Sequence, residues 1–158
     1  MIFVTLGNHN QEFTRLVRRI DEIAPKIKEK IIIQRGYTKY TPKNCESFEF
    51  APSLKPFYEK ARIVIGHAAS SAWEFLYDYE KPLIVVPRKK KYNEHINDHQ
   101  VEFAQVLEKK TGVKAIYNIK ELTPELLEKY KKIGKIDDSN LKKLQIFLKK
   151  KIQEIENE

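Results

Sequence analysis

Apolar residues in this chain fall into two kinds of segment that alternate along the sequence. Short runs rich in Val, Ile, Leu and Phe predict strands at residues 2–6, 31–34, 47–50, 63–65, 83–86 and 114–117. Longer segments with apolar residues three or four apart predict helices at residues 12–23, 54–60, 71–78, 96–109 and 124–132. Strand runs of this kind are continuously apolar when both faces of a sheet are covered. The pattern therefore predicts an α/β fold, a Rossmann-like parallel sheet flanked by helices.

The end of the chain predicts an amphipathic helix over residues 139–157. Asp138 or Ser139 can cap its start, and its apolar positions then recur every three or four residues: Leu141, Leu144, Leu148, Ile152 and Ile155. Two uses of this stripe stay open: docking on the protein's own sheet, and contact with a partner subunit or a membrane surface. Since the sequence contains no repeat or Gly/Ser linker, we expect one domain over residues 1–158.

Composition limits the classes of protein that fit. The net charge of +8 predicts a surface that attracts anions, although a solvated coat of lysines would explain it equally well. No apolar run reaches the ~20 residues of a membrane span. The N-terminus reads as a strand with no basic residues before it, so we expect no signal peptide. One cysteine, Cys45, fits the reducing cytoplasm. We find no aromatic platform or helix–turn–helix pattern that would indicate nucleic-acid binding.

Polar residues concentrate in the loops that follow three of the predicted strands, at residues 7–11, 66–71 and 87–100. In an open parallel sheet, ligands bind beyond the carboxyl ends of the strands, where helix N-termini present free N–H groups. All four histidines of the chain lie in these loops: His9, His67, His95 and His99. Such convergence predicts a ligand site at this edge of the sheet.

The residue types in these loops suit a nucleotide sugar. The turn at 66–71 offers backbone amides and two hydroxyls before a helix, which is a plausible arrangement for phosphate. Glu74, one turn into that helix, can accept hydrogen bonds from ribose hydroxyls. A cluster of donors and acceptors suited to sugar hydroxyls follows later: Asn97, Asp98, His99 and Gln100. Arg88 is a candidate cation for stabilising phosphate charge.

The sequence motifs of other ligand-binding and catalytic classes are missing or incomplete. The chain has no Gly-x-Gly-x-x-Gly after its first strand, no Gly-Lys-Ser/Thr loop and no Gly-x-Ser-x-Gly elbow, which disfavours dinucleotide enzymes, P-loop NTPases and serine hydrolases. His95 and His99 have the spacing of two zinc ligands on a helix, but the metalloprotease Glu and a third ligand are missing. We therefore expect neither a metal nor a cofactor.

Four segments resemble the C-terminal domain of glycosyltransferase family 28. They are residues 4–16 (VTLGNHNQEFTRL), 34–38 (QRGYT), 81–88 (KPLIVVPR) and 94–100 (EHINDHQ), and the similarity extends from residue 1 to about residue 112. Within the family, these segments resemble the stand-alone subunits of two-chain enzymes. Those enzymes act in exopolysaccharide synthesis and in the second GlcNAc transfer to dolichol-linked oligosaccharide.

The resemblance implies the donor-binding half of a GT-B glycosyltransferase that uses a UDP-sugar without a metal. A membrane-anchored partner would supply the acceptor-binding domain and the catalytic base, which would place this chain at the cytoplasmic face of the membrane. A homo-oligomer of the isolated chain stays open. The implied donor site comprises Gly7, Asn8, His9, Phe50, Ala51, His67, Ala68, Ala69, Ser70, Ser71, Glu74, Asn97, Asp98, His99 and Gln100.

Two departures from the family pattern leave a second hypothesis open. The family's phosphate turn is rich in glycine, whereas this chain has Ala68 and Ala69 there, and alanine adopts a positive φ less readily. Counting without gaps also puts the family's ribose-binding Glu at Phe75, one residue after Glu74. Either the turn is locally shortened, which restores Glu74, or the ribose clamp is weakened. The alternative function is accordingly a non-catalytic scaffold subunit with a degenerate donor site.

Overall fold

The computed structural model describes residues 1–137 and Ser139, so the predicted helix at 139–157 lies outside the described residues apart from its first position. The six strands form one sheet in the order β3-β2-β1-β4-β5-β6. Every pair is parallel, and Ile2 of β1 pairs with Ile31 of β2 and Ile63 of β4. The bounds are β1 Ile2–Thr5, β2 Ile31–Gln34, β3 Glu46–Phe48, β4 Ile63–Gly66, β5 Leu83–Val85 and β6 Lys114–Ala115. The predicted Rossmann-like α/β fold is confirmed.

Helices connect the strands as the sequence pattern predicts. The α-helices are α1 Thr14–Ile23, α2 Lys55–Lys60, α3 Ser70–Tyr79, α4 His99–Thr111 and α5 Pro124–Lys129. Three short 3-10 turns were not predicted: η1 Ala24–Lys26, η2 Lys90–Tyr92 and η3 Ile119–Glu121. The largest boundary errors are the start of α4, at His99 and not at residue 96, and the end of α5, at Lys129 and not at residue 132. The Asp98 side chain accepts a hydrogen bond from the Lys90 amide at 2.9 Å. This contact holds residues 96–98 in the loop before α4.

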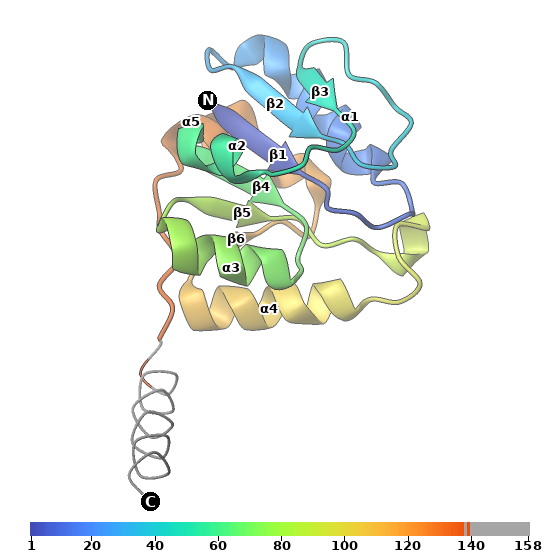
Figure 1. Ribbon diagram of the computed structural model, residues 1–158. Coiled ribbons are helices and arrows are strands. Elements are labelled where there is room, and N and C mark those ends of the chain that lie inside the picture. The colour runs from blue at the N-terminus through green and yellow to red at the C-terminus, as the bar shows by residue number, and fades with distance from the viewer. Residues whose placement is uncertain (138, 140–158) are drawn as a thin grey trace, which may run out of the picture.

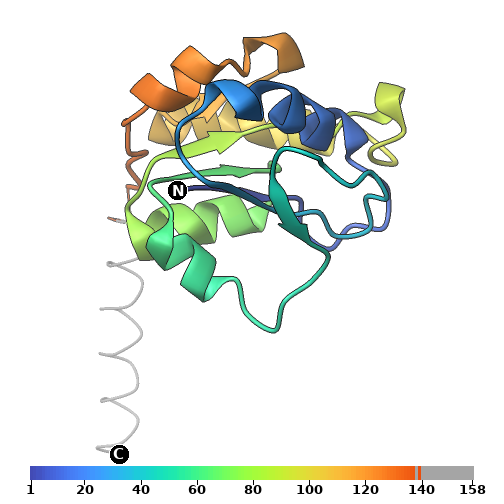
Figure 2. The same cartoon turned by 90° about the horizontal axis from the view of Figure 1, so that it is seen from above.

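The strands alternate their side chains between two buried layers. Ile2 and Val4 of β1 pack with α1 and α5 on one face of the sheet. Phe3 packs on the other face, with aromatic residues of α2 and with buried residues of α3 and α4. Figures 1 and 2 show α1 and α3 on opposite sides of the sheet. Because both faces are covered, the central strands are almost wholly apolar, as the sequence indicates.

Asp21 of α1 forms hydrogen bonds with the long connection between β2 and β3. Its buried carboxylate accepts hydrogen bonds from the Tyr40 hydroxyl at 2.7 Å and from the amides of Lys43 and Asn44 at 3.0 and 2.7 Å. Burial alone would raise the pKa of Asp21, but the hydrogen bonds from Tyr40, Asn44 and Lys43 together lower it below its ordinary value. The carboxylate is therefore a structural acceptor that holds this connection on the helix.

All strands end at the same edge, since the sheet is parallel. In Figure 1 the strands point towards the right, where the loops after β1, β2 and β5 gather. This edge is the one at which the sequence predicts a ligand site. Among the described helices, none is long and apolar enough to cross a membrane.

Candidate functional site

Gly7 and His67 lie in contact where β1 and β4 end. These two strands are neighbours in the sheet, and each of these residues follows the end of its strand. Gly7 has a φ of +71°, and a β-carbon built on it would lie 2.5 Å from Cε1 of the His67 ring. Only glycine fits both the backbone conformation and the imidazole beside it. Gly7 therefore makes room for a side chain of the protein itself, in addition to any ligand.

Gln34 ties the loop after β1 to the neighbouring strands. Its buried side-chain oxygen accepts from the Thr5 hydroxyl at 2.9 Å and from the Gly7 amide at 3.1 Å, and its side-chain nitrogen donates to the carbonyls of Gly7 and Glu49. Gly36, at φ +53°, packs so closely that a β-carbon would lie 2.7 Å from the Gly7 carbonyl oxygen. Sequence reasoning missed Gln34, although an amide at the end of an apolar strand is a signal for such a role.

The turn from His67 to α3 adopts ordinary backbone angles. Among the described residues, the non-glycine residues with positive φ are Glu80 and Asn93, neither of which is in this turn. Ala69 precedes α3 with φ −138° and ψ 179°, and Ala68 packs its methyl group into the core. Alanine is therefore unstrained at both positions, and Ala68 can reach a ligand only through its backbone. Ser70 and Ser71 occupy the first turn of α3, whose amides lack intrahelical acceptors.

The structure distinguishes Glu74 from Phe75, the two positions considered for the residue that binds the ribose. Phe75 is 2% exposed and stacks on Tyr79 in the core, with ring centroids 5.3 Å apart, so it is not available to a ligand. Glu74 lies on the exposed side of α3. Of the two positions, the ribose contact stays a prediction for Glu74.

Arg88 does not lie where the sequence analysis expects a phosphate-stabilising cation. The side chain is 1% exposed, and its guanidinium donates to the carbonyls of Gln11 at 2.7 Å, Leu6 at 2.9 Å and Glu94 at 3.2 Å. It also lies over the Phe13 ring. Burial lowers the pKa of Arg88 to about 10, while the Glu94 carboxylate acts in the opposite direction. Arg88 is therefore not free to contact phosphate directly, and it positions the loop after β1 against the loop after β5.

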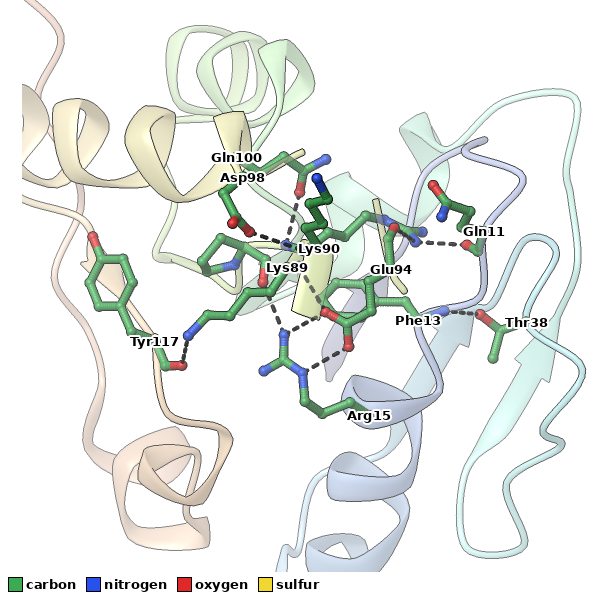
Figure 3. A network of polar contacts seen from close by, with 12 residues as sticks. Gln11, Phe13, Arg15, Thr38, Lys89, Lys90, Glu94, Asp98, Gln100 and Tyr117 are labelled. Carbon is green, nitrogen blue, oxygen red and sulfur yellow. Dashed lines mark hydrogen bonds and ion pairs between the residues drawn. The ribbon is translucent and has the colours of Figure 1, made fainter. Parts of the chain in front are cut away.

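A largely buried ion pair between Arg15 and Glu94 also joins α1 to the loop after β5 (Figure 3). Arg15 of α1 donates to both carboxylate oxygens of Glu94 at 2.8 Å, and it also donates to the Pro87 carbonyl at 3.0 Å. Glu94 accepts a third hydrogen bond from the Lys89 amide at 3.0 Å. Neither residue was predicted, although both fall within segments that resemble the family. They fix the shape of the loop that carries the predicted sugar-binding residues.

The predicted sugar-binding residues are only partly free to meet a ligand. Gln100 is buried, and its side-chain oxygen accepts from the Arg88 amide at 3.1 Å. Asp98 is exposed and uses one carboxylate oxygen to accept from Lys90 (Figure 3). The Asn97 side-chain oxygen contacts Nδ1 of His99 and accepts from the His99 amide. The loop is thus held by its own polar side chains, with Asn97, Asp98 and His99 exposed at its surface.

The four histidines converge as the sequence predicts. His9 and His95 are stacked with ring centroids 4.3 Å apart, and His99 meets His95 edge-on at 4.4 Å. Nδ1 of both His67 and His95 is buried without a hydrogen-bond partner among the described residues. Burial, followed by the charges of Arg88, His9 and His95, lowers the pKa of His67 to about 4. The pKa of His95 is also lowered, first by burial and then by its histidine neighbours and Arg88.

Phe50 has an aromatic neighbour that the sequence analysis missed. Tyr37, just after β2, meets Phe50 edge-on with ring centroids 5.0 Å apart. The two side chains are 53% and 47% exposed, so the carboxyl edge presents an aromatic pair to solvent beside Ala51. No periodic pattern signals this pair, because the two residues lie in loops that only the fold brings together.

Two hollows of the surface lie away from the predicted donor residues, and a third, very small one touches them. A hollow of about 830 Å³ lies between the C-terminal half of α3 and residues 133–136. A recess of about 490 Å³ lies between residues 11–15 and residues 92–94. Beneath the start of α3 there is only a very small cavity, lined in part by Thr5, His67 and Ser71. Within residues 1–137 and 139, no three acidic, His or Cys side chains are grouped to hold a metal ion.

The fold is that of a Rossmann-like domain, and comparisons with known proteins agree. The model of the glycosyltransferase family 28 C-terminal domain matches residues 1–157, and the chain belongs to this family. No curated protein matches it.

Solved structures share the fold at low sequence identity. The glycosyltransferase SnogD from Streptomyces nogalater aligns with a TM-score of 0.57 and 19% identity, covering 97% of this chain and 39% of that one. MurG of Acinetobacter baumannii aligns with a TM-score of 0.53 and 18% identity, covering 78% of this chain and 38% of that one. The spinosyn forosaminyltransferase SpnP aligns with a TM-score of 0.53 and 14% identity, covering 80% of this chain and 34% of that one. The chain thus spans less than two fifths of each of these proteins.

Proposed function

We propose that this chain binds the UDP-sugar donor of a glycosyltransferase and transfers the hexose together with a membrane-anchored partner. The acceptor would be a lipid-linked sugar or a growing polysaccharide. One observation carries the proposal. In a domain of family 28, the starts of α3 and α4 and all four histidines converge beside Gly7, at the edge of the sheet where nucleotides bind.

Each part of the donor has a place along this edge in the proposal. The diphosphate meets the first turn of α3 and the backbone at Gly7 and Asn8, since a helix N-terminus favours negative charge. The uracil lies near Ala51, where the exposed rings of Tyr37 and Phe50 offer a surface for stacking. Of the other predicted residues, Glu74 serves the ribose, and Asn97, Asp98 and Gln100 serve the hexose. His9, His67 and His99 lie where the hexose joins the diphosphate.

The chemistry proposed for this chain is electrostatic. Negative charge develops on the diphosphate as the glycosidic bond to UDP breaks, and α3, with ten residues, places the positive end of its dipole there. The Arg88 guanidinium, held on three backbone carbonyls, keeps the loops after β1 and β5 in register. The partner supplies the base that activates the acceptor hydroxyl. The exposure of Tyr37, Phe50 and residues 97–99 supports a two-part enzyme, because a second domain would then close over these residues.

Titration of the purified chain with UDP, ADP, GDP and CDP tests the proposal directly. We expect UDP to bind more tightly than the other three, because the base site near Ala51 must select uracil. Asp98→Ala should weaken binding of a UDP-sugar more than binding of UDP, because it removes a predicted contact with the hexose. Glu125→Gln, on the exposed surface of α5, is the control and should bind both ligands as the wild type does. Failure of every nucleotide to bind, with or without the partner, would refute the proposal.

The scaffold hypothesis has lost part of its motivation, because Ala68 and Ala69 adopt unstrained backbone angles. A cell assay separates the two functions. If the chain only stabilises its partner, Asp98→Ala should leave glycan synthesis intact. If it binds the donor, synthesis should fall while the amounts of both subunits remain normal.

A further inference from the structure

Three imidazoles form a continuous stack at the proposed donor site. His9 comes from the loop after β1, His95 from the loop before α4, and His99 from the first position of α4. His95 is central: His9 lies parallel to it at 4.3 Å with planes 9° apart, and His99 meets it at 4.4 Å with planes 83° apart. Segments far apart in sequence have therefore placed three titratable rings in direct contact.

The surroundings of the stack disfavour a proton in the absence of an anion. Within the described part of the chain, no salt bridge involves a histidine. The two nearest carboxylates on the same loop are engaged, Glu94 with Arg15 and Asp98 with the Lys90 amide. Two other groups face the stack, Arg88 and His67. Arg88 is positive and His67 is neutral or positive, so neither attracts a proton to the stack.

One nitrogen of the central ring has no hydrogen-bond partner within the described residues. His9 Nε2 is bonded to the Gln11 side-chain oxygen at 2.8 Å, and Nδ1 of His99 contacts the Asn97 side-chain oxygen. Nδ1 of His95, by contrast, is buried with no partner among residues 1–137 and 139. A buried polar atom without a partner costs free energy, so His95 is the ring that gains most from a new acceptor or a bound proton.

We propose that the stack of His9, His95 and His99 binds the diphosphate of the donor by taking up a proton. This inference rests on the proposed function, and it adds that donor binding and protonation are one coupled event. A diphosphate brings the negative charge that the stack lacks, and an opposite charge within ~4–6 Å raises the pKa of a histidine by about 1–3 units. One shared proton on the stack satisfies the geometry, because stacked imidazolium rings would repel each other.

Coupling of this kind gives donor affinity a definite dependence on pH. In the free protein the pKa of His95 is lowered by burial first and by neighbouring rings second, so this ring is neutral at pH 8. The bound diphosphate raises that pKa. Between the bound and free values, affinity increases by up to about tenfold for each unit that the pH falls, since one pKa unit is 1.36 kcal/mol. Above the bound value no proton is taken up and affinity is constant.

Calorimetric titration measures the proton directly. UDP-glucose and UDP-N-acetylglucosamine are the probes, because their diphosphate diester has no group that titrates between pH 5 and 8. Binding is measured with the tag-free protein at several pH values, in buffers of different ionisation enthalpy. We expect uptake of a fraction of a proton up to one near pH 6.5, and affinity about tenfold higher at pH 6 than at pH 8.

His95→Gln should abolish the uptake and flatten the pH profile, while Glu125→Gln should behave as the wild type. In case His95→Gln does not fold, NMR titration of the wild type with and without the probe reports the same event, as a rise in the pKa of the stacked histidines. Binding with no pH dependence and no uptake overturns the inference and leaves the proposed function intact. Uptake that persists in a folded His95→Gln overturns the role of the stack. No binding of either probe or of UDP at any pH overturns both.

Discussion

Glu94→Ala tests whether the buried pair with Arg15 holds the loop that carries the predicted sugar site. The Glu94 side chain is 3% exposed and that of Arg15 is 14% exposed, so both charges are largely withdrawn from water. The substitution removes three hydrogen bonds, from Nε and Nη2 of Arg15 and from the Lys89 amide. It also leaves the Arg15 guanidinium without its counter-charge.

The expected cost follows from this geometry. Removing one partner of a buried ion pair destabilises a protein by about 3–5 kcal/mol. Arg15 keeps its hydrogen bond to the Pro87 carbonyl, which places the expectation near the lower end, at about 3 kcal/mol. For a chain of this length such a loss lowers the melting temperature by about 6–12 °C. Denaturant unfolding followed through the fluorescence of Trp73, the one tryptophan of the chain, measures it.

An exposed pair on α5 provides a matched control. Glu125 and Lys129 lie 3.7 Å apart with side chains 80% and 79% exposed, so Glu125→Ala should cost only about 0.3–0.5 kcal/mol. In a double-mutant cycle, Arg15→Met together with Glu94→Ala should be less destabilising than the sum of the two single substitutions, because no charge is left unpaired. If Glu94→Ala cost no more than the control, or if the cycle showed no coupling, the reasoning would be refuted.

Three further predictions concern other contacts of the fold. Gly7→Ala should destabilise the protein by about 1–3 kcal/mol in denaturant unfolding, because φ is +71° and the new carbon would overlap His67; an unchanged midpoint would contradict the close contact. Asp21→Asn should destabilise at neutral pH and should weaken acid sensitivity. The pKa of the native Asp21 carboxylate is lowered, so its stabilisation is present above the pKa of the unfolded chain and is lost as the pH falls through the pKa of the folded protein. Acid unfolding of the wild type and of Asp21→Asn with the same dependence on pH would count against this. His67 should titrate near pH 4 in an NMR experiment, and a midpoint close to 6.5 would show that the ring is not withdrawn from water as described.

The edge at which the polar loops gather was predictable from the sequence, whereas the contacts of individual side chains were not. The convergence of four histidines followed from their positions after strand ends, because parallel strands bring such loops to one edge. The sequence did not reveal the positioning role of Arg88, because it says that an arginine follows β5 but not which way its guanidinium turns. Three backbone carbonyls compete successfully for that guanidinium. The choice between Glu74 and Phe75 also needed the helix to be placed, since one residue rotates a side chain by about 100°.

The sequence by itself determined the strands, the helices and the edge at which polar residues gather. These follow from local periodicity and from the rule that a parallel sheet needs helices on both faces, and both are readable from consecutive residues. Tertiary structure alone decided the contacts between loops: the ring of His67 against Gly7, the Arg15–Glu94 pair, and the stacked imidazoles of His9 and His95. The members of each of these three contacts lie between 60 and 86 positions apart in the sequence. A hydrogen bond or a ring stack across such a distance depends on where the backbone brings the two ends, and no local pattern of residues encodes that.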